Sequence, residues 1–169
     1  TLGDHGLFKV RAGFNRPLSD NLAMRASFIS NIRDGFTENL SNGQDLDDSD
    51  SFSARVRLKY EPSDTFRANF MTQIFDEDRN GAAQKGIIDP TPDPRQLRQN
   101  SITEHKLEAQ LFSAVLEWDL ESFSVKSLTS YQVDDILVRR DNDRNDLSYL
   151  PPFALLPSEY DPETNKQTT

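Results

Sequence analysis

Two acidic segments hold the residues of this 169-residue chain that could bind a metal ion. The first carries Asp45, Asp47, Asp48 and Asp50, and the second carries Asp141, Asp143 and Asp146. Ca²⁺ prefers several carboxylate or carbonyl oxygens in one loop. The second segment begins like an EF-hand loop, but Asp146 stands where that loop needs glycine, and Pro152 where it needs glutamate. We therefore expect solvated loops here and no metal site.

Catalytic chemistry finds little support in the sequence. The only two histidines, His5 and His105, are far apart, and the chain has no cysteine. A zinc site or a catalytic dyad needs partners that this spacing does not provide. The sequence contains no phosphate-binding loop, dinucleotide fingerprint or nucleophile elbow. It predicts a protein that is not an enzyme and needs no cofactor.

Six arginines are the strongest candidates for recognition, because each lies on the polar side of a segment in which apolar and polar residues alternate. They are Arg11, Arg25, Arg33, Arg55, Arg57 and Arg67. Guanidinium groups bind carboxylates through two parallel hydrogen bonds. The row could guide an anionic substrate such as a ferric chelate. We favour the other interpretation, in which it pairs with acidic groups of neighbouring strands or of a domain that plugs a barrel.

Six segments of the chain show the alternation that positions these arginines. In the clearest one, Phe52, Ala54, Val56, Leu58 and Tyr60 alternate with Ser51, Ser53, Arg55, Arg57 and Lys59. The others begin near Phe8, Leu22, Phe66, Leu111 and Phe123. A period of two residues predicts β-strands with one apolar face, whereas a helix would spread the charges around its whole circumference.

Short turns and long loops alternate between these segments. The short turns are residues 17–21, 61–65 and 119–122, and the long connections are residues 34–50, 76–104 and 141–169. Large aromatic residues flank every short turn: Phe14, Tyr60, Phe66, Trp118 and Phe123. Such a belt is expected where strands cross a membrane interface. The arrangement predicts an all-β fold, a section of an antiparallel up-and-down transmembrane β-barrel with about six strands, short periplasmic turns and long outer loops.

A soluble sheet with one face on a core is the simpler explanation of the alternation. The segments hold roughly 9–14 residues, however, which exceeds the soluble mode of about 5–6 and suits a tilted membrane strand of about 9–11. A hydrophobic content of only 35% is compatible with a barrel, which needs apolar residues at alternate positions only. The net charge of −9 argues against a nucleic-acid partner.

Both ends of the sequence indicate a piece of a longer chain. Thr1-Leu2-Gly3-Asp4 has neither the basic start nor the apolar stretch of a signal peptide, and the last five residues are polar. Six strands also cannot close, because the smallest membrane barrels have 8 strands and lipid does not tolerate an open sheet edge. We expect the missing strands to come from outside residues 1–169.

Several motifs resemble the early barrel of TonB-dependent outer-membrane receptors. They are Pro17-Leu18-Ser19-Asp20, Leu22-Ala23-Met24-Arg25, Arg33-Asp34-Gly35-Phe36 and Pro62-Ser63-Asp64. Val125-Lys126-Ser127-Leu128-Thr129-Ser130-Tyr131 is similar to a later strand of these barrels. The resemblance covers residues 5–75 well and residues 105–140 in part.

This resemblance implies a barrel of about 22 strands with a plugged lumen in the bacterial outer membrane. It also implies TonB-powered uptake of a scarce nutrient, most often a ferric siderophore and otherwise cobalamin, haem or a carbohydrate. The plug and the segment that binds TonB have no counterpart here, so the partner TonB would act through a part outside this chain. A porin or structural barrel and a soluble carbohydrate-binding β-sandwich are the alternatives. The Pro-rich residues 89–94 are expected to face outside, and the apolar residues 151–157 could contact a ligand or simply pack within their loop.

Overall fold

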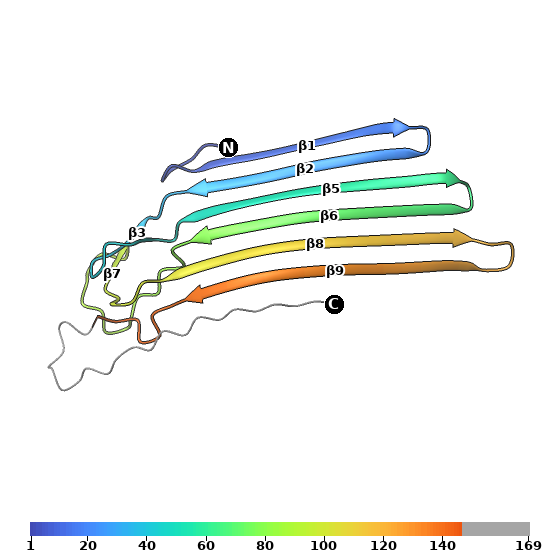
Figure 1. Ribbon diagram of the computed structural model, residues 1–169. Helices are drawn as coiled ribbons and strands as arrows, with labels where there is room; N and C mark the ends of the chain where they lie inside the picture. Colours follow the sequence, from blue (N-terminus) through green and yellow to red (C-terminus); the bar gives the residue numbers. More distant parts are fainter. Residues whose placement is uncertain (147–169) are drawn as a thin grey trace.

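The computed structural model describes residues 1–146, in which six long strands form one open antiparallel sheet (Figure 1). The strands are β1 (Phe8–Ser19), β2 (Leu22–Arg33), β5 (Ser49–Ser63), β6 (Phe66–Arg79), β8 (Glu104–Asp119) and β9 (Ser124–Arg139). Each pairs with its neighbours in that order, so β1 and β9 are the edge strands. The predicted all-β, antiparallel, six-stranded architecture is confirmed. The sheet does not close on itself.

The three predicted short turns lie together at one end of the sheet, and the long connections lie at the other (Figure 1). Only two residues separate β1 from β2 and β5 from β6. The register shifts between Pro17 and Ser19 and again between Tyr60 and Ser63, close to the turns. Proline cannot donate a ladder hydrogen bond, so Pro17 on an edge strand and Pro62 inside a bulge occupy positions where this loss is tolerated.

Four strands extend further toward the long loops than the sequence predicted. Asp50 lies within β5, and Asp76, Glu77 and Asp78 lie within β6, so the prediction that these acidic residues belong to loops is wrong. β8 begins at Glu104 instead of near Leu111, and β9 continues to Arg139. In several of these extensions both faces of the strand carry polar or charged residues. The alternation of apolar and polar residues, from which a strand is predicted, is therefore missing there.

The strand register joins the apolar residues into one continuous face. One row across all six strands is Phe14, Ala26, Val56, Thr72, Phe112 and Tyr131. Directly paired residues of an antiparallel sheet point to the same side. The predicted faces of the strands are thus confirmed, including the exception Ile29, which pairs with Arg11 on the polar face.

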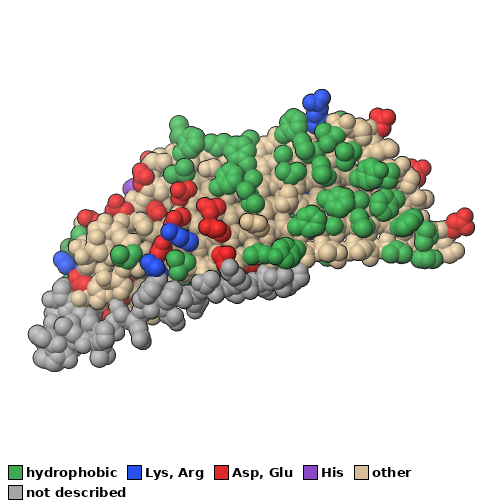
Figure 2. Space-filling model, viewed as in Figure 1, with side chains coloured by type: hydrophobic (Ala, Val, Ile, Leu, Met, Phe, Trp, Pro, Cys, Tyr) green, Lys and Arg blue, Asp and Glu red, His purple; other side chains and the backbone are tan. Residues whose placement is uncertain are grey.

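Little of the described chain covers this apolar face. Figure 2 shows its hydrophobic side chains gathered over the strands, and Phe14, Phe112 and Trp118 are 51%, 45% and 54% exposed. Of the sheet's hydrophobic residues only Ala68 is buried, at 2% exposure. Within residues 1–146, no second sheet of comparable size packs on the first. The six strands therefore lack the hydrophobic core that stabilises a soluble domain.

The border between apolar and charged residues on this face is slanted relative to the strands. Ile32 of β2 pairs with the charged Asp50 of β5, and Phe52 of β5 pairs with the charged Asp76 of β6. From β2 to β6, the first charged residue of this face therefore lies one paired position closer to the short turns on each successive strand. It then stays level, because Asp76, Glu108 and Asp135 form one row. The border is thus stepped between β2 and β6 and level from β6 to β9.

The long connections fold into a second, smaller unit at the loop end of the sheet (Figure 1). We call residues 34–48, 80–103 and 140–146 the loop layer. It contains β3 (Thr37–Asn39), β4 (Asp45–Leu46) and β7 (Gln96–Leu97), in which β3 pairs antiparallel with β4 and parallel with β7. Leu46 and Leu97 are fully buried here. None of the described residues forms a helix long and apolar enough to cross a membrane.

Side chains hold the loop layer together by bonding to distant backbone groups. Asn39, which is fully buried, donates from Nδ2 to the Gln99 carbonyl and accepts from the Gln99 N–H through Oδ1, both at 3.0 Å. Gln44 does the same for Thr103, which lies in the same connection as Gln99. Gly35 allows a close approach, because a Cβ there would lie 2.5 Å from the Asp45 carbonyl oxygen. The connections thus fix one another.

Candidate functional site

The strand register puts all six predicted arginines on the polar face of the sheet. Arg25 lies directly opposite Arg57, and Arg55 lies opposite Ser27. Arg11 and Arg33 lie on β1 and β2, and Arg67 lies on β6 opposite Glu117. The structure therefore brings Arg25, Arg55 and Arg57 together and leaves the other three apart from them.

Three of the six arginines are engaged with neighbouring groups. Arg67 contacts Glu117 through Nε at 3.2 Å and Asp119 through Nη2 at 2.7 Å. Arg33 donates to the Asp47 carbonyl at 2.6 Å, and its guanidinium lies 4.9 Å from the centroid of the Phe36 ring. Arg55 donates from Nε to Gln73 at 2.8 Å. Pairing with acidic groups of a neighbouring strand, the interpretation we favoured, holds for Arg67 alone.

Arg11, Arg25 and Arg57 make no hydrogen bond or ion pair with any side chain in residues 1–146. Like charges directly opposite each other on a sheet are destabilising, so the pair Arg25–Arg57 calls for an anionic partner. A hollow of about 180 Å³ is lined by Arg25, Ser27, Arg55 and Arg57, and we call it the arginine hollow. Its guanidinium forks and hydroxyl suit a carboxylate or another oxyanion.

A larger hollow of about 720 Å³ also follows the polar face and shares Arg25 and Arg57 with the arginine hollow. Its other polar lining residues include Asn15, Asn69, Ser113 and Lys126. These groups donate and accept hydrogen bonds, but no nucleophile with an adjacent base lies among them. The arrangement can hold a polar solute through hydrogen bonds and ion pairs.

The acidic segments act mainly as connectors within the loop layer. Asp47 accepts from the Thr37 hydroxyl at 2.7 Å and from the Ala83 N–H at 2.9 Å. Asp48 accepts from the Asn80 N–H at 2.8 Å, and partial burial raises its pKa. Asp141 accepts from the N–H groups of Ser101 and Arg144. Among residues 1–146, no three His, Cys, Asp or Glu side chains are arranged to hold a metal ion.

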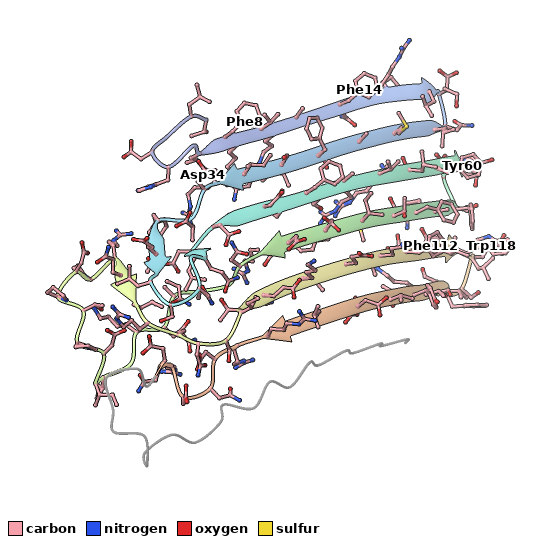
Figure 3. The ribbon with its side chains drawn as sticks, turned by 60° about the vertical axis from the view of Figure 1, so that its left-hand side comes forward. Phe8, Phe14, Asp34, Tyr60, Phe112 and Trp118 are labelled. Carbon is pink, nitrogen blue, oxygen red and sulfur yellow. The ribbon has the colours of Figure 1, made fainter. Side chains whose placement is uncertain are left out.

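The two histidines are separate from each other and from the arginine hollow. The His5 ring lies 5.3 Å from the Phe36 ring, which also has the Arg95 guanidinium 4.4 Å from its centroid. His105 Nδ1 lies 3.2 Å from Glu77 on β6. The stacking around Phe36 gives the Arg33-Asp34-Gly35-Phe36 segment a structural role, and Figure 3 shows Asp34 where β2 enters the loop layer.

Sequence reasoning missed the polar residues that complete the two hollows. Gln73 orients Arg55, and Glu117 contacts both Arg67 and Lys126, the latter at 2.7 Å. Cross-strand alignment of the predicted segments could have found these pairs, because each partner lies on the same polar face. The Pro-rich residues 89–94 lie in the loop layer, whereas the apolar residues 151–157 lie outside the described residues.

Comparisons with known proteins leave the family of the chain open. No family model, no curated protein and no solved structure matches it. The resemblance to TonB-dependent receptors stays a prediction from the motifs quoted above.

Proposed function

We propose that this chain forms part of the wall of a TonB-dependent outer-membrane receptor, with the apolar face toward lipid and the polar face toward a wet lumen. The receptor takes up a scarce nutrient, most often a ferric siderophore, with energy from TonB delivered through a plug outside this chain. Further strands pair with the edges of β1 and β9, because lipid does not tolerate free sheet edges. The mechanism is binding and gated passage.

The observation that carries this proposal is the bare, continuous apolar face with its slanted border. Strands of membrane barrels tilt by about 35–45°, so a band parallel to the membrane crosses them obliquely. The charged border crosses β2, β5 and β6 obliquely in this way. A soluble sandwich would instead cover Phe28, Phe52 and Phe70, which are 40%, 39% and 36% exposed.

The arginine hollow gives the proposed lumen an anion-attracting wall. The cations on the polar face of β1, β2 and β5 include Arg11, Arg25, Arg55, Arg57 and Lys59. Glu61 pairs with Lys59 at 2.7 Å, which leaves the arginines uncompensated by acids of these strands. Ferric chelates that carry free carboxylates would be concentrated near such a surface.

Trp118, the only tryptophan of the chain, tests the orientation of the sheet. It lies on the apolar face near the short turns (Figure 3). We would fold the full-length protein into vesicles with ordinary or brominated acyl chains, and subtract the fluorescence of Trp118→Phe. Bromine should quench the Trp118 signal. Leu128→Trp in the Trp118→Phe background, on the opposite face, should be quenched much less, and equal quenching of both would overturn the proposal.

Uptake measurements separate the alternatives. A strain that lacks the gene should lose accumulation of a labelled ferric siderophore, and so should a strain without TonB. Arg25→Gln with Arg57→Gln should lower uptake of an anionic chelate while the amount of receptor in the outer membrane stays constant. Passage that persists without TonB would identify the porin alternative, and purification as a monomer without detergent would identify the soluble β-sandwich.

A further inference from the structure

A pocket of about 220 Å³ lies where the loop layer meets the ends of β6, β8 and β9. Its lining includes Arg79, Gln99, Thr103, His105, Arg140 and Asp141, and we call it the Gln99 pocket. It shares no lining residue with the arginine hollow. The volume is large enough for several water molecules or one compact ligand.

Gln99 presents an acceptor that no group within residues 1–146 uses. The residue is 1% exposed, and its backbone is held from both sides by Asn39 at 3.0 Å. Its Nε2 donates to the Gln84 carbonyl at 2.8 Å, whereas its Oε1 is buried without a hydrogen bond. Rotating the amide would place two acceptors against each other, so the Gln84 carbonyl fixes the orientation.

Two more orphaned atoms belong to residues that line the same pocket. Arg79 Nε and His105 Nδ1 lie 2.7 Å and 3.2 Å from Glu77 Oε1, yet all three buried atoms lack a well-directed hydrogen bond. Three of the five orphaned atoms found in residues 1–146 thus belong to lining residues of one pocket. Arg79 Nε and His105 Nδ1 still have the Glu77 carboxylate beside them, whereas Gln99 Oε1 has no such partner, and native proteins leave few buried groups in that state.

The charges around the pocket indicate which groups are still available. Glu104 is occupied by Lys106 at 2.9 Å and by Arg139 at 3.0 Å. Asp141 accepts from two backbone N–H groups, at 3.1 Å and 2.8 Å. Arg140 is exposed, and its side chain makes no hydrogen bond or ion pair within residues 1–146. Arg79 and His105 lie against Glu77, so the groups left open at the pocket are the Arg140 guanidinium as donor and Gln99 Oε1 as acceptor.

We propose that the Gln99 pocket binds a compact carboxylate that carries a neighbouring hydroxyl or amide N–H. The carboxylate pairs with the Arg140 guanidinium, and the hydroxyl or N–H donates to Gln99 Oε1. A buried, pre-oriented acceptor discriminates against analogues that lack the donor, because such ligands leave it unpaired. This inference holds whether or not the apolar face meets lipid.

Three small probes of similar shape test the two halves of the proposal. Lactate has both groups, propionate lacks the hydroxyl and propane-1,2-diol lacks the carboxylate. We would measure saturation of the folded full-length protein by ligand-observed NMR. Lactate should bind about three- to tenfold more tightly than either analogue, the range expected for one hydrogen bond. Absence of saturable lactate binding, or equal binding of lactate and propionate, would overturn the proposal and leave a pocket filled by water.

Two variants assign the preference to named residues. Gln99→Leu should weaken lactate binding to the level of propionate and leave propionate unchanged. Arg140→Gln should weaken both carboxylates and leave the diol unchanged, and its exposed position makes misfolding no concern. Arg57→Gln, in the separate arginine hollow, is the matched control and should change none of the three. Lactate affinity that resists both Gln99→Leu and Arg140→Gln would refute the site.

Discussion

The sheet and the loop layer differ in whether their side chains are buried and bonded within the described chain. All ten buried residues of the described chain except Ala68 and Asp134 lie in the loop layer. Most of these are polar, among them Thr37, Asn39 and Gln99. The sheet, by contrast, leaves large apolar side chains bare on one face and cations on the other. One region is completed by its own hydrogen bonds, whereas the other needs surroundings that the described residues do not supply.

This difference separates two sources of stability. The strands of the sheet pair along their length, whereas the apolar side chains of Phe14, Val56 and Phe112 find little to pack against within residues 1–146. The loop layer has little apolar area to bury and depends instead on side chains that pair with backbone groups up to 60 residues away. Substitutions should therefore act on the sheet through polarity and on the loop layer through hydrogen bonding.

Val56→Arg should have the largest effect, because it places a charge in the middle of the apolar face. If that face meets lipid, the cost is about 2–4 kcal/mol near the membrane midplane. We expect slow or incomplete folding into vesicles, measured as the fraction that migrates as the heat-modifiable folded form on a gel. Arg57→Ala, the neighbouring position on the opposite face, should fold normally. Normal folding of Val56→Arg together with failure of Arg57→Ala would show that the two faces are inverted.

Asn39→Ala should have the second largest effect and should act on the loop layer alone. It leaves the N–H and C=O of Gln99 buried without partners, at about 1–3 kcal/mol for an unsatisfied group. Hydrogen exchange should rise in residues 96–103 and stay unchanged in β5 and β6. Asn42→Ala removes hydrogen bonds at an exposed position and is the control. Equal loss of protection in the two variants would contradict the prediction that the buried hydrogen bonds of Asn39 stabilise the loop layer more than the exposed ones of Asn42.

The same contrast explains what the sequence could predict. A strand such as β5 repeats its signal every two residues, and the aromatic and polar residues beside each short turn mark the strand ends. The loop layer has no such repetition, because β4 and β7 have only two residues each. Its decisive contact, Asn39 with Gln99, joins residues that no local period relates. The alternation in the sequence predicts that the arginines of the hollow share one face of the sheet. That Arg25 lies directly opposite Arg57 can be known only from the register of β2 and β5.

Glu117→Gln should have a smaller effect on the sheet. It removes the carboxylate that Arg67 and Lys126 share at 3.2 Å and 2.7 Å, while Arg67 keeps Asp119. Because the network is exposed to solvent, we expect only a small loss of stability in unfolding by denaturant. Arg67→Met in the Glu117→Gln background completes a double-mutant cycle, and a coupling energy of zero would show that the network adds nothing beyond its separate parts.

The smallest effect should be a pH dependence of the loop layer at Asp143. Partial desolvation and the neighbouring Asp141 carboxylate raise the pKa of Asp143 to about 6, from 3.8. A pKa that is higher in the folded state stabilises the fold fully below about pH 4, and this contribution is lost as the pH rises through 6. Asp143 is exposed, so solvent weakens the effect. Opening of residues 141–146, measured by exchange corrected for the intrinsic rate, should increase from pH 4 to 6.5. Asp143→Asn should flatten the profile, and protection that grows with pH in the unmodified protein would reverse the sign and contradict the assigned repulsion from Asp141.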